Sequence, residues 1–112
     1  MTRIPRTVKV GPHTYRIKRV GTKEFPKHQK ELMGCCDYNE NLVYMLRGMN
    51  LEKSQEILLH ELLHACCYPS LIDVQLDDEL FVDNMAPHLL QMLQDNPRLV
   101  AYLTQKKESH AV

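Results

Sequence analysis

The sequence predicts an α+β fold, in which a small antiparallel sheet of about four strands lies beside one central helix and two or three further helices. Three observations support this class. Most of the first half alternates apolar and polar residues, with turn residues between the alternating segments. An apolar run at residues 57–67 contains neither Gly nor Pro, as a buried helix would. Pro87 and Pro97 then divide a second half of helical character.

Length and composition describe an ordinary globular protein. A chain of 112 residues can bury one hydrophobic core, so we expect residues 1–112 to form a single domain. The formal net charge is zero, which disfavours nucleic acid or a membrane surface as a partner. No apolar run has the length of a membrane span, and residues 1–6 lack the apolar part of a signal peptide. We therefore expect a cytoplasmic protein.

Two β-hairpins are expected in the first half. Thr7–Val10 and Thr14–Val20 alternate around a Gly-Pro turn. The predicted inward face of this hairpin carries Val8, Val10, Tyr15 and Ile17. Residues 33–37 and 42–46 flank a second turn that is rich in Asn, and we expect 42–46 to be an edge strand. The polar residues 21–32 predict a loop or one short helix.

The second half predicts helices. Asn50 is a good N-cap for a helix that begins at residue 51. Pro87 should kink the following helix or begin a new one, because proline lacks the N–H that bonds to residue 83. The expected helices cover residues 51 to about 68, 77–86, 87–93 and 98–105. Residues 106–112 are expected to form a flexible tail.

The apolar run contains His60-Glu61-Leu62-Leu63-His64, a HExxH motif. With 3.6 residues per turn, the two histidines lie within about 40° of each other and Glu61 lies about 100° from His60, so one side of the helix carries all three. We expect this helix to be buried, and two buried imidazoles beside a carboxylate need a partner. Zn²⁺ would be that partner, with His60 and His64 as ligands and Glu61 as general base. Two core histidines that flank a glutamate by chance are the simpler alternative, which the helical context disfavours.

A catalytic zinc ion needs a third protein ligand. The metzincin continuation of the motif is absent, because Cys67 and Ser70 occupy its Gly and His positions. Glu79 and Asp83 stand four residues apart on one face of the next predicted helix. Glu79 would ligate the metal, and Asp83 would accept the second ring N–H of a ligand histidine. The weaker candidate ligands are Asp73, Asp77 and Asp78.

Four cysteines occur as two adjacent pairs, at residues 35–36 and 66–67. Side chains of neighbouring strand residues point to opposite faces, so these pairs make a poor four-thiolate zinc site. Free buried thiols are the expected state in a cytosolic protein. Cys67 follows His64 by three residues and is a minor candidate for a place near the metal.

With these motifs the chain resembles the gluzincin group of zincin metallopeptidases. It is most similar to minimal gluzincins of about this length, and to small phage and prophage proteins related to the ImmA/IrrE peptidases. The resemblance rests on HELLH at 60–64 and ELFVD at 79–83, and it covers roughly residues 4–105. It implies a minimal zincin-like fold, and it assigns His60, His64 and Glu79 to the metal, Glu61 to the general base and Asp83 to the orientation of a ligand. The sequence differs from larger gluzincins in having no counterpart of their C-terminal lobe.

The expected function is that of a zinc-dependent metalloendopeptidase, with Zn²⁺ as cofactor and a peptide or protein as substrate. Strand 42–46 is expected to hold an extended substrate by main-chain hydrogen bonds. Residues 106–112 are a candidate for a segment that covers the cleft or for a contact between copies of the chain. The candidate donors to the oxyanion are Tyr68, His88 and Tyr102.

Two alternatives remain. The first is a non-catalytic zinc-binding module of phage or prophage origin, with a regulatory or interaction role. The second is a DNA-associated peptidase of the SprT type, which the zero net charge disfavours. The basic residues Arg16, Lys18 and Arg19 are explained more simply by a solvated strand face than by contact with nucleic acid.

Overall fold

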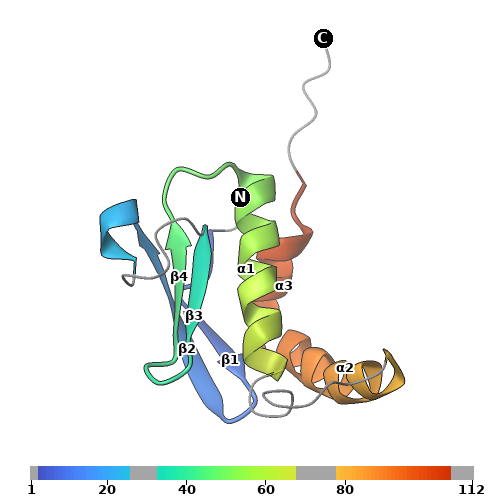
Figure 1. The fold of residues 1–112 in the computed structure, drawn as a ribbon. Helices are drawn as coiled ribbons and strands as arrows, with labels where there is room; N and C mark the ends of the chain where they lie inside the picture. The colour runs from blue at the N-terminus through green and yellow to red at the C-terminus, as the bar shows by residue number, and fades with distance from the viewer. Residues whose placement is uncertain (1–2, 26–32, 68–77, 107–112) are drawn as a thin grey trace.

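One four-stranded sheet carries helices on one of its faces in the computed structural model (Figure 1). The structure describes residues 3–25, 33–67 and 78–106, without the side chains of residues 78–82 and 84. In chain order the elements are β1 (Thr7–Val10), β2 (His13–Val20), the 3-10 turn η1 (Thr22–Glu24), β3 (Gly34–Asp37), β4 (Leu42–Leu46), α1 (Leu51–Cys67), α2 (Asp78–Asp95) and α3 (Pro97–Thr104). The α+β class predicted from the sequence is confirmed.

Both predicted hairpins are present. β1 pairs with β2 in antiparallel fashion, and Gly11 at the turn has a φ of 58°, which glycine adopts without strain. Val8, Val10 and Tyr15 are buried as the alternation predicted, and Ile17 is partly buried. β3 and β4 form the second antiparallel hairpin.

The order of the strands differs from the prediction. The sheet runs β1-β2-β4-β3, and β2 pairs with β4 in parallel, so the sheet is mixed and not wholly antiparallel. The expectation that residues 42–46 form an edge strand is therefore wrong: β4 is internal and β3 is an edge. The composition of β4 explains its place, because Leu42, Val43 and Met45 are buried on the two faces of the sheet.

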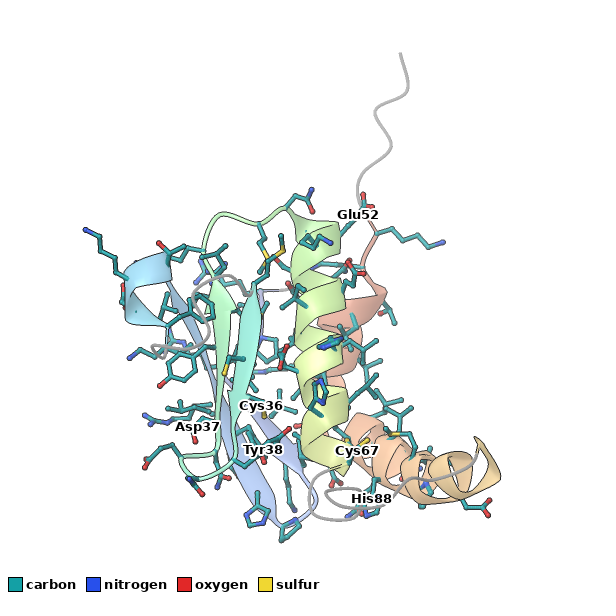
Figure 2. The ribbon with its side chains drawn as sticks, in the orientation of Figure 1. Cys36, Asp37, Tyr38, Glu52, Cys67 and His88 are labelled. Carbon is teal, nitrogen blue, oxygen red and sulfur yellow. The ribbon has the colours of Figure 1, made fainter. Side chains whose placement is uncertain are left out.

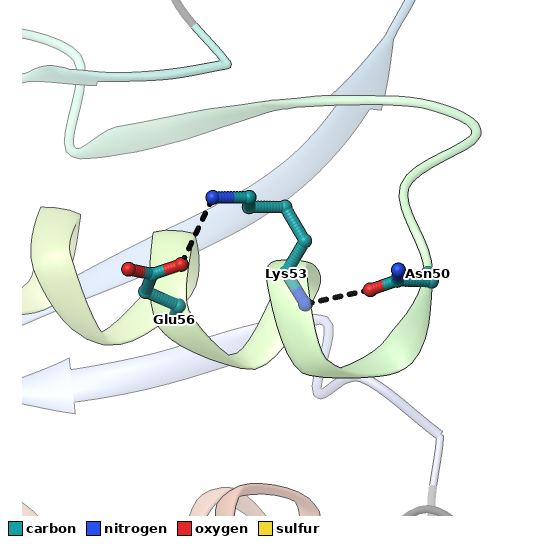
Figure 3. A network of polar contacts seen from close by, with 3 residues as sticks. All are labelled: Asn50, Lys53 and Glu56. Atoms are coloured by element: carbon teal, nitrogen blue, oxygen red, sulfur yellow. Dashed lines mark hydrogen bonds and ion pairs between the residues drawn. The ribbon is translucent and has the colours of Figure 1, made fainter.

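Asn50 caps the helix that carries the motif, as predicted. The Asn50 side-chain Oδ1 accepts a hydrogen bond of 2.8 Å from the backbone N–H of Lys53. Lys53 Nζ also lies 3.1 Å from Glu56 Oε2, one turn farther along the helix (Figure 3). This ion pair is exposed and adds little stability, so the cap is the stronger signal for where α1 begins.

The hydrophobic core lies between the sheet and the three helices. Leu58 and Leu62 of α1 are fully buried in it, together with Met92 of α2 and Leu99 of α3. α2 continues through Pro87, so of the two alternatives predicted there, a kink or a new helix, the new helix does not occur. None of the helices in the described ranges has the length and apolar character needed to cross a bilayer.

Asn96, between α2 and α3, holds the helices to the outer side of β1. Its Oδ1 accepts a hydrogen bond from the backbone N–H of Lys9 at 2.9 Å, and its Nδ2 donates to the carbonyl oxygen of Lys9 at 2.7 Å. The same Nδ2 donates to the carbonyl oxygen of Met92 at 2.7 Å. The side-chain amide thus bonds to Lys9 in the way that the backbone of a neighbouring strand would.

We expect Asn96→Ala to lower the free energy of unfolding by about 2 kcal/mol, because hydrogen bonds of this kind contribute about 1 kcal/mol each. The measurement is urea denaturation followed by circular dichroism. Asn39→Ala is the matched control, because Asn39 is exposed in a turn and its side chain makes no bond among the described residues. Equal midpoints for the two variants would contradict the role assigned to Asn96.

Candidate functional site

The two histidines of the motif have the spacing of a chelating pair. His60 Nε2 and His64 Nε2 are 3.2 Å apart, and their rings meet edge to face. Two nitrogen ligands of a tetrahedral zinc ion are about 3.3 Å apart, since each Zn–N bond is about 2.0–2.1 Å long. The described nitrogen pair therefore fits one edge of a tetrahedral metal site.

The motif is less buried than the sequence predicted. The His60 side chain is 62% exposed and His64 is also exposed, whereas the Glu61 side chain is only 10% exposed. The expectation that both imidazoles are buried is therefore wrong. The cause is the orientation of α1, which points Leu58 and Leu62 into the core and leaves the histidines at the surface.

Burial raises the pKa of the Glu61 carboxyl, and nearby His60 and His64 lower it by a smaller amount. Glu61 Oε2 lies 4.0 Å from His60 Nε2, which is too long for a hydrogen bond. A carboxylate with a raised pKa is a stronger base than an exposed one. Glu61 is therefore placed next to the histidine pair as a base whose strength is increased by its surroundings.

A cleft of about 340 Å³ lies at the motif and is lined by residues of α1, of β3 and of the turn after β3. We call it the motif cleft, and its lining includes Gly34, Cys36, Tyr38, His60, Glu61 and His64. Figure 2 shows Cys36 and Tyr38 on the side of β3 that faces α1. Both residues were missed as site candidates, because only the pairing of β3 at the edge of the sheet brings them to the motif.

Tyr38 adds a hydroxyl group to the motif cleft. Burial raises the pKa of Tyr38 to about 12, with further contributions from Cys36, Tyr15 and Glu61. The phenol is therefore protonated at neutral pH and can donate a hydrogen bond. Among the predicted oxyanion donors, Tyr102 is instead buried in the core, His88 is exposed on α2, and Tyr68 lies outside the described residues.

On its outer side, β3 has main-chain groups that pair with no strand among residues 3–25, 33–67 and 78–106. The backbone N–H of Leu46 donates to the carbonyl oxygen of Met33 at 2.9 Å, which fixes the phase of the β3–β4 ladder. Hydrogen-bonded pairs alternate along an antiparallel ladder, so the N–H and C=O groups of Gly34 and Cys36 point away from β4. No other strand of the described residues pairs with this side.

Gly34 allows β3 to approach α1 closely. A Cβ at this position would lie 2.7 Å from Ile57 Cγ2 and 3.1 Å from Glu61 Cγ. The first separation is shorter than real Cβ contacts, so the Ile57 side chain, the strand or the helix would have to shift, and Glu61 would have to give by a few tenths of an ångström. The absence of a side chain at Gly34 therefore helps to bury Glu61.

The third predicted ligand is not located by the structure. Glu79 lies in the first turn of α2, but its side chain is outside those described, as is that of Asp78; Asp73 and Asp77 lie outside the described residues altogether. Asp83 is exposed on α2, whose first turns extend away from α1 (Figure 1). Within the described side chains, no three His, Cys, Asp or Glu residues form a metal-binding group. The roles of Glu79 and Asp83 remain predictions.

The four cysteines are free thiols. Burial, with help from Glu61, raises the pKa of Cys36 to about 12, and burial raises the pKa of Cys67. Cys66 is buried in the core, where its Sγ lies 3.7 Å from Met92 Sδ. A thiol that stays protonated is a weak nucleophile, so these raised pKa values do not favour a catalytic cysteine–histidine pair at neutral pH.

Comparisons of the chain with protein-family models, with curated proteins and with solved structures find no match. Its function is therefore inferred from the residues that line the motif cleft and from their geometry.

We expect Gly34→Ala to lower the free energy of unfolding by about 1–3 kcal/mol, because the new methyl group overpacks the contact with Ile57. Urea denaturation measures the change. Gly21→Ala is the control, since Gly21 has a φ of −79° and its nearest potential contact, Glu24 Oε1, is 3.8 Å away. The control should differ from the wild type by less than about 0.5 kcal/mol. A Gly34→Ala protein as stable as the control would refute the close approach.

We expect Cys36 to resist alkylation by iodoacetamide at pH 8.5. With its pKa raised from 9.0 to about 12, its thiolate fraction falls by several hundredfold relative to the unfolded chain. The alkylation rate should then rise about tenfold per pH unit, because the thiolate fraction does so below the pKa. Mass spectrometry of alkylated peptides measures the rate, with the urea-unfolded protein as reference. Equal rates in the folded and unfolded protein would contradict the raised pKa.

Proposed function

We propose that the protein is a zinc-dependent metalloendopeptidase that hydrolyses peptide bonds with Glu61 as general base. One arrangement carries this proposal. Two histidine nitrogens lie 3.2 Å apart beside a buried carboxylate, and all three groups line one cleft next to β3, which is an edge strand among the described residues. A metal ligand pair, a base and a place for a peptide are the components that metal-assisted peptide hydrolysis requires.

The metal would be held by His60 and His64, with Glu79 proposed as third ligand and Asp83 proposed to orient one of the histidines. When bound, Zn²⁺ supplies a Lewis acid that polarises the scissile carbonyl and makes water nucleophilic at neutral pH. The exposed His60 and His64 leave space for a substrate beside them. The free thiols are consistent with a cytoplasmic location, which we also propose.

Glu61 would move the proton. Its carboxylate accepts a proton from the attacking water and then donates that proton to the nitrogen of the departing amine. The raised pKa of Glu61 suits both steps, because it strengthens the base and still permits release of the proton.

The substrate would bind along β3 and not along the internal strand β4. The outward N–H and C=O groups of Gly34 and Cys36 can pair with an extended peptide, as in strand addition to a sheet edge. We propose the Tyr38 hydroxyl as a donor to the carbonyl oxygen of the scissile bond, because Tyr38 lines the same cleft and is protonated at neutral pH.

A second candidate function is a non-catalytic zinc-binding interaction module, of the kind found among phage and prophage proteins. The exposure of His60 and His64 favours it, because a partner protein could then complete the coordination of the metal. In that case Glu61 would have no chemical step to perform. The two proposed functions predict different effects of a Glu61 substitution on peptide cleavage.

We expect Glu61→Gln to keep the metal and the fold but to slow peptide cleavage by at least about a hundredfold, the typical contribution of a general base. Metal content is measured by mass spectrometry of the purified protein, and cleavage with a library of internally quenched peptides. His60→Ala should lose both metal and cleavage. Glu56→Gln is the control, because Glu56 lies on the same helix with a side chain that is 68% exposed.

The enzymatic proposal fails if wild type and Glu61→Gln cleave at the same rate. It also fails if the wild-type protein binds no divalent metal, or if removal of the metal by a chelator leaves cleavage unchanged. Metal binding without any cleavage would favour the interaction module.

A further inference from the structure

Four arginines gather around the N-terminal segment, away from the motif cleft. Arg3, Arg6 and Arg19 line a cavity of about 480 Å³, which we call the arginine hollow. A second hollow of about 450 Å³ shares Arg3 and Arg6 and adds Arg98 from the first turn of α3. The N-terminal segment 3–6 therefore borders two neighbouring depressions that are both lined by guanidinium groups.

These positive charges are not neutralised within the part of the chain that the structure describes. No arginine forms an ion pair with a carboxylate among the described residues. No Asp or Glu lines either hollow. A chain with a formal net charge of zero thus carries a local excess of positive charge at this surface.

The floor of the arginine hollow combines aliphatic and hydroxyl groups. Ile4, Met49 and Leu51 line it and pack against the core. Ser54 and Tyr102 add hydroxyl groups, and the Ser54 hydroxyl donates to the carbonyl oxygen of Met49 at 3.4 Å. Burial raises the pKa of Tyr102, and the nearby charge of Arg19 lowers it by a smaller amount. A ligand that matches this site carries negative charge next to an aliphatic group.

We propose that the arginine hollow binds an acidic peptide segment of a partner protein, with an aliphatic side chain on the floor and carboxylates on Arg3, Arg6 and Arg19. A guanidinium group pairs with a carboxylate through two parallel hydrogen bonds, which gives both affinity and orientation. A single-stranded nucleic acid fits less well: its phosphates would meet the arginines, but its bases stack on exposed aromatic faces, and Tyr102 in the lining is only 4% exposed.

The arginine hollow and the motif cleft are separate sites. They share no lining residue, although α1 contributes Leu51 and Ser54 to the hollow and Glu61 and both motif histidines to the cleft. A peptide in the hollow would leave the motif open. The proposal therefore does not depend on peptidase activity, and His60→Ala should not change peptide binding.

The test is fluorescence anisotropy with the full chain and a labelled peptide of seven residues, in which two leucines are spaced among glutamates. We expect saturable binding that weakens as salt is added. Arg19→Gln and the double variant Arg3→Gln with Arg6→Gln should each lower the affinity by about tenfold or more. Arg16→Gln is the matched control, because Arg16 is exposed on the opposite face of β2. Circular dichroism confirms that each variant is folded.

Several results would overturn the proposal. One is unchanged affinity in both arginine variants, and another is an equal loss in Arg16→Gln. Equal binding of a peptide with serine in place of leucine would show that the aliphatic floor is not used. Tighter binding of a DNA oligonucleotide, lost in the same variants, would make the hollow a nucleic-acid site. The double variant changes two exposed side chains, so its affinity tests the proposal even if Arg19→Gln fails to fold.

Discussion

The packing of α1 on the sheet through Leu58 and Leu62 determines the geometry of the motif cleft. Both side chains are fully buried, so the helix cannot rotate without exposing them to water. In a helix of 3.6 residues per turn, that one orientation points His60 and His64 outward and leaves Glu61 at the boundary with the core. The accessible nitrogens and the desolvated carboxylate thus have a common cause, which is core packing.

β3 completes the site from the other side. Gly34 lets the strand approach the helix at Glu61. The contact that shields the carboxylate from water thus involves a strand whose outer side pairs with no other strand in the part of the chain that the structure describes. The proposed proton transfer by Glu61 and the proposed binding of a peptide along β3 would therefore depend on the same contact between β3 and α1. A change that moves β3 outward would affect the base and the proposed substrate edge together, even if no motif residue were altered.

Much of the fold could be predicted from the sequence because its signals are local. The hairpin alternation, the cap at Asn50 and the helix over the motif each depend on residues close together in the chain. The parallel pairing of β2 with β4 depends on residues that are distant in the sequence. The local feature that could have predicted an internal position for β4 is the apolar character of both its faces. Similarly, the spacing of Glu79 and Asp83 shows that they share a helix face but cannot show where that helix points.

The exposure of the histidines illustrates another limit. An apolar run predicts that a helix is buried, but the orientation of the helix decides which of its residues meet water, and that orientation follows from the shapes of the packing partners. Tyr38 became part of the cleft for a related reason. It belongs to a turn, and only the position of the β3–β4 hairpin in the sheet brings that turn to α1.

The side-chain amide of Asn96 makes the two edge strands of the sheet, β1 and β3, different from each other. At β1 it occupies the N–H and C=O groups of Lys9, while the outward groups of Gly34 and Cys36 in β3 pair with no other strand among the described residues. Growth of the sheet by an added strand is thereby directed to one side. Recognition of an extended chain and unwanted strand-to-strand aggregation would compete for the same margin, so a bound peptide would protect the protein against self-assembly.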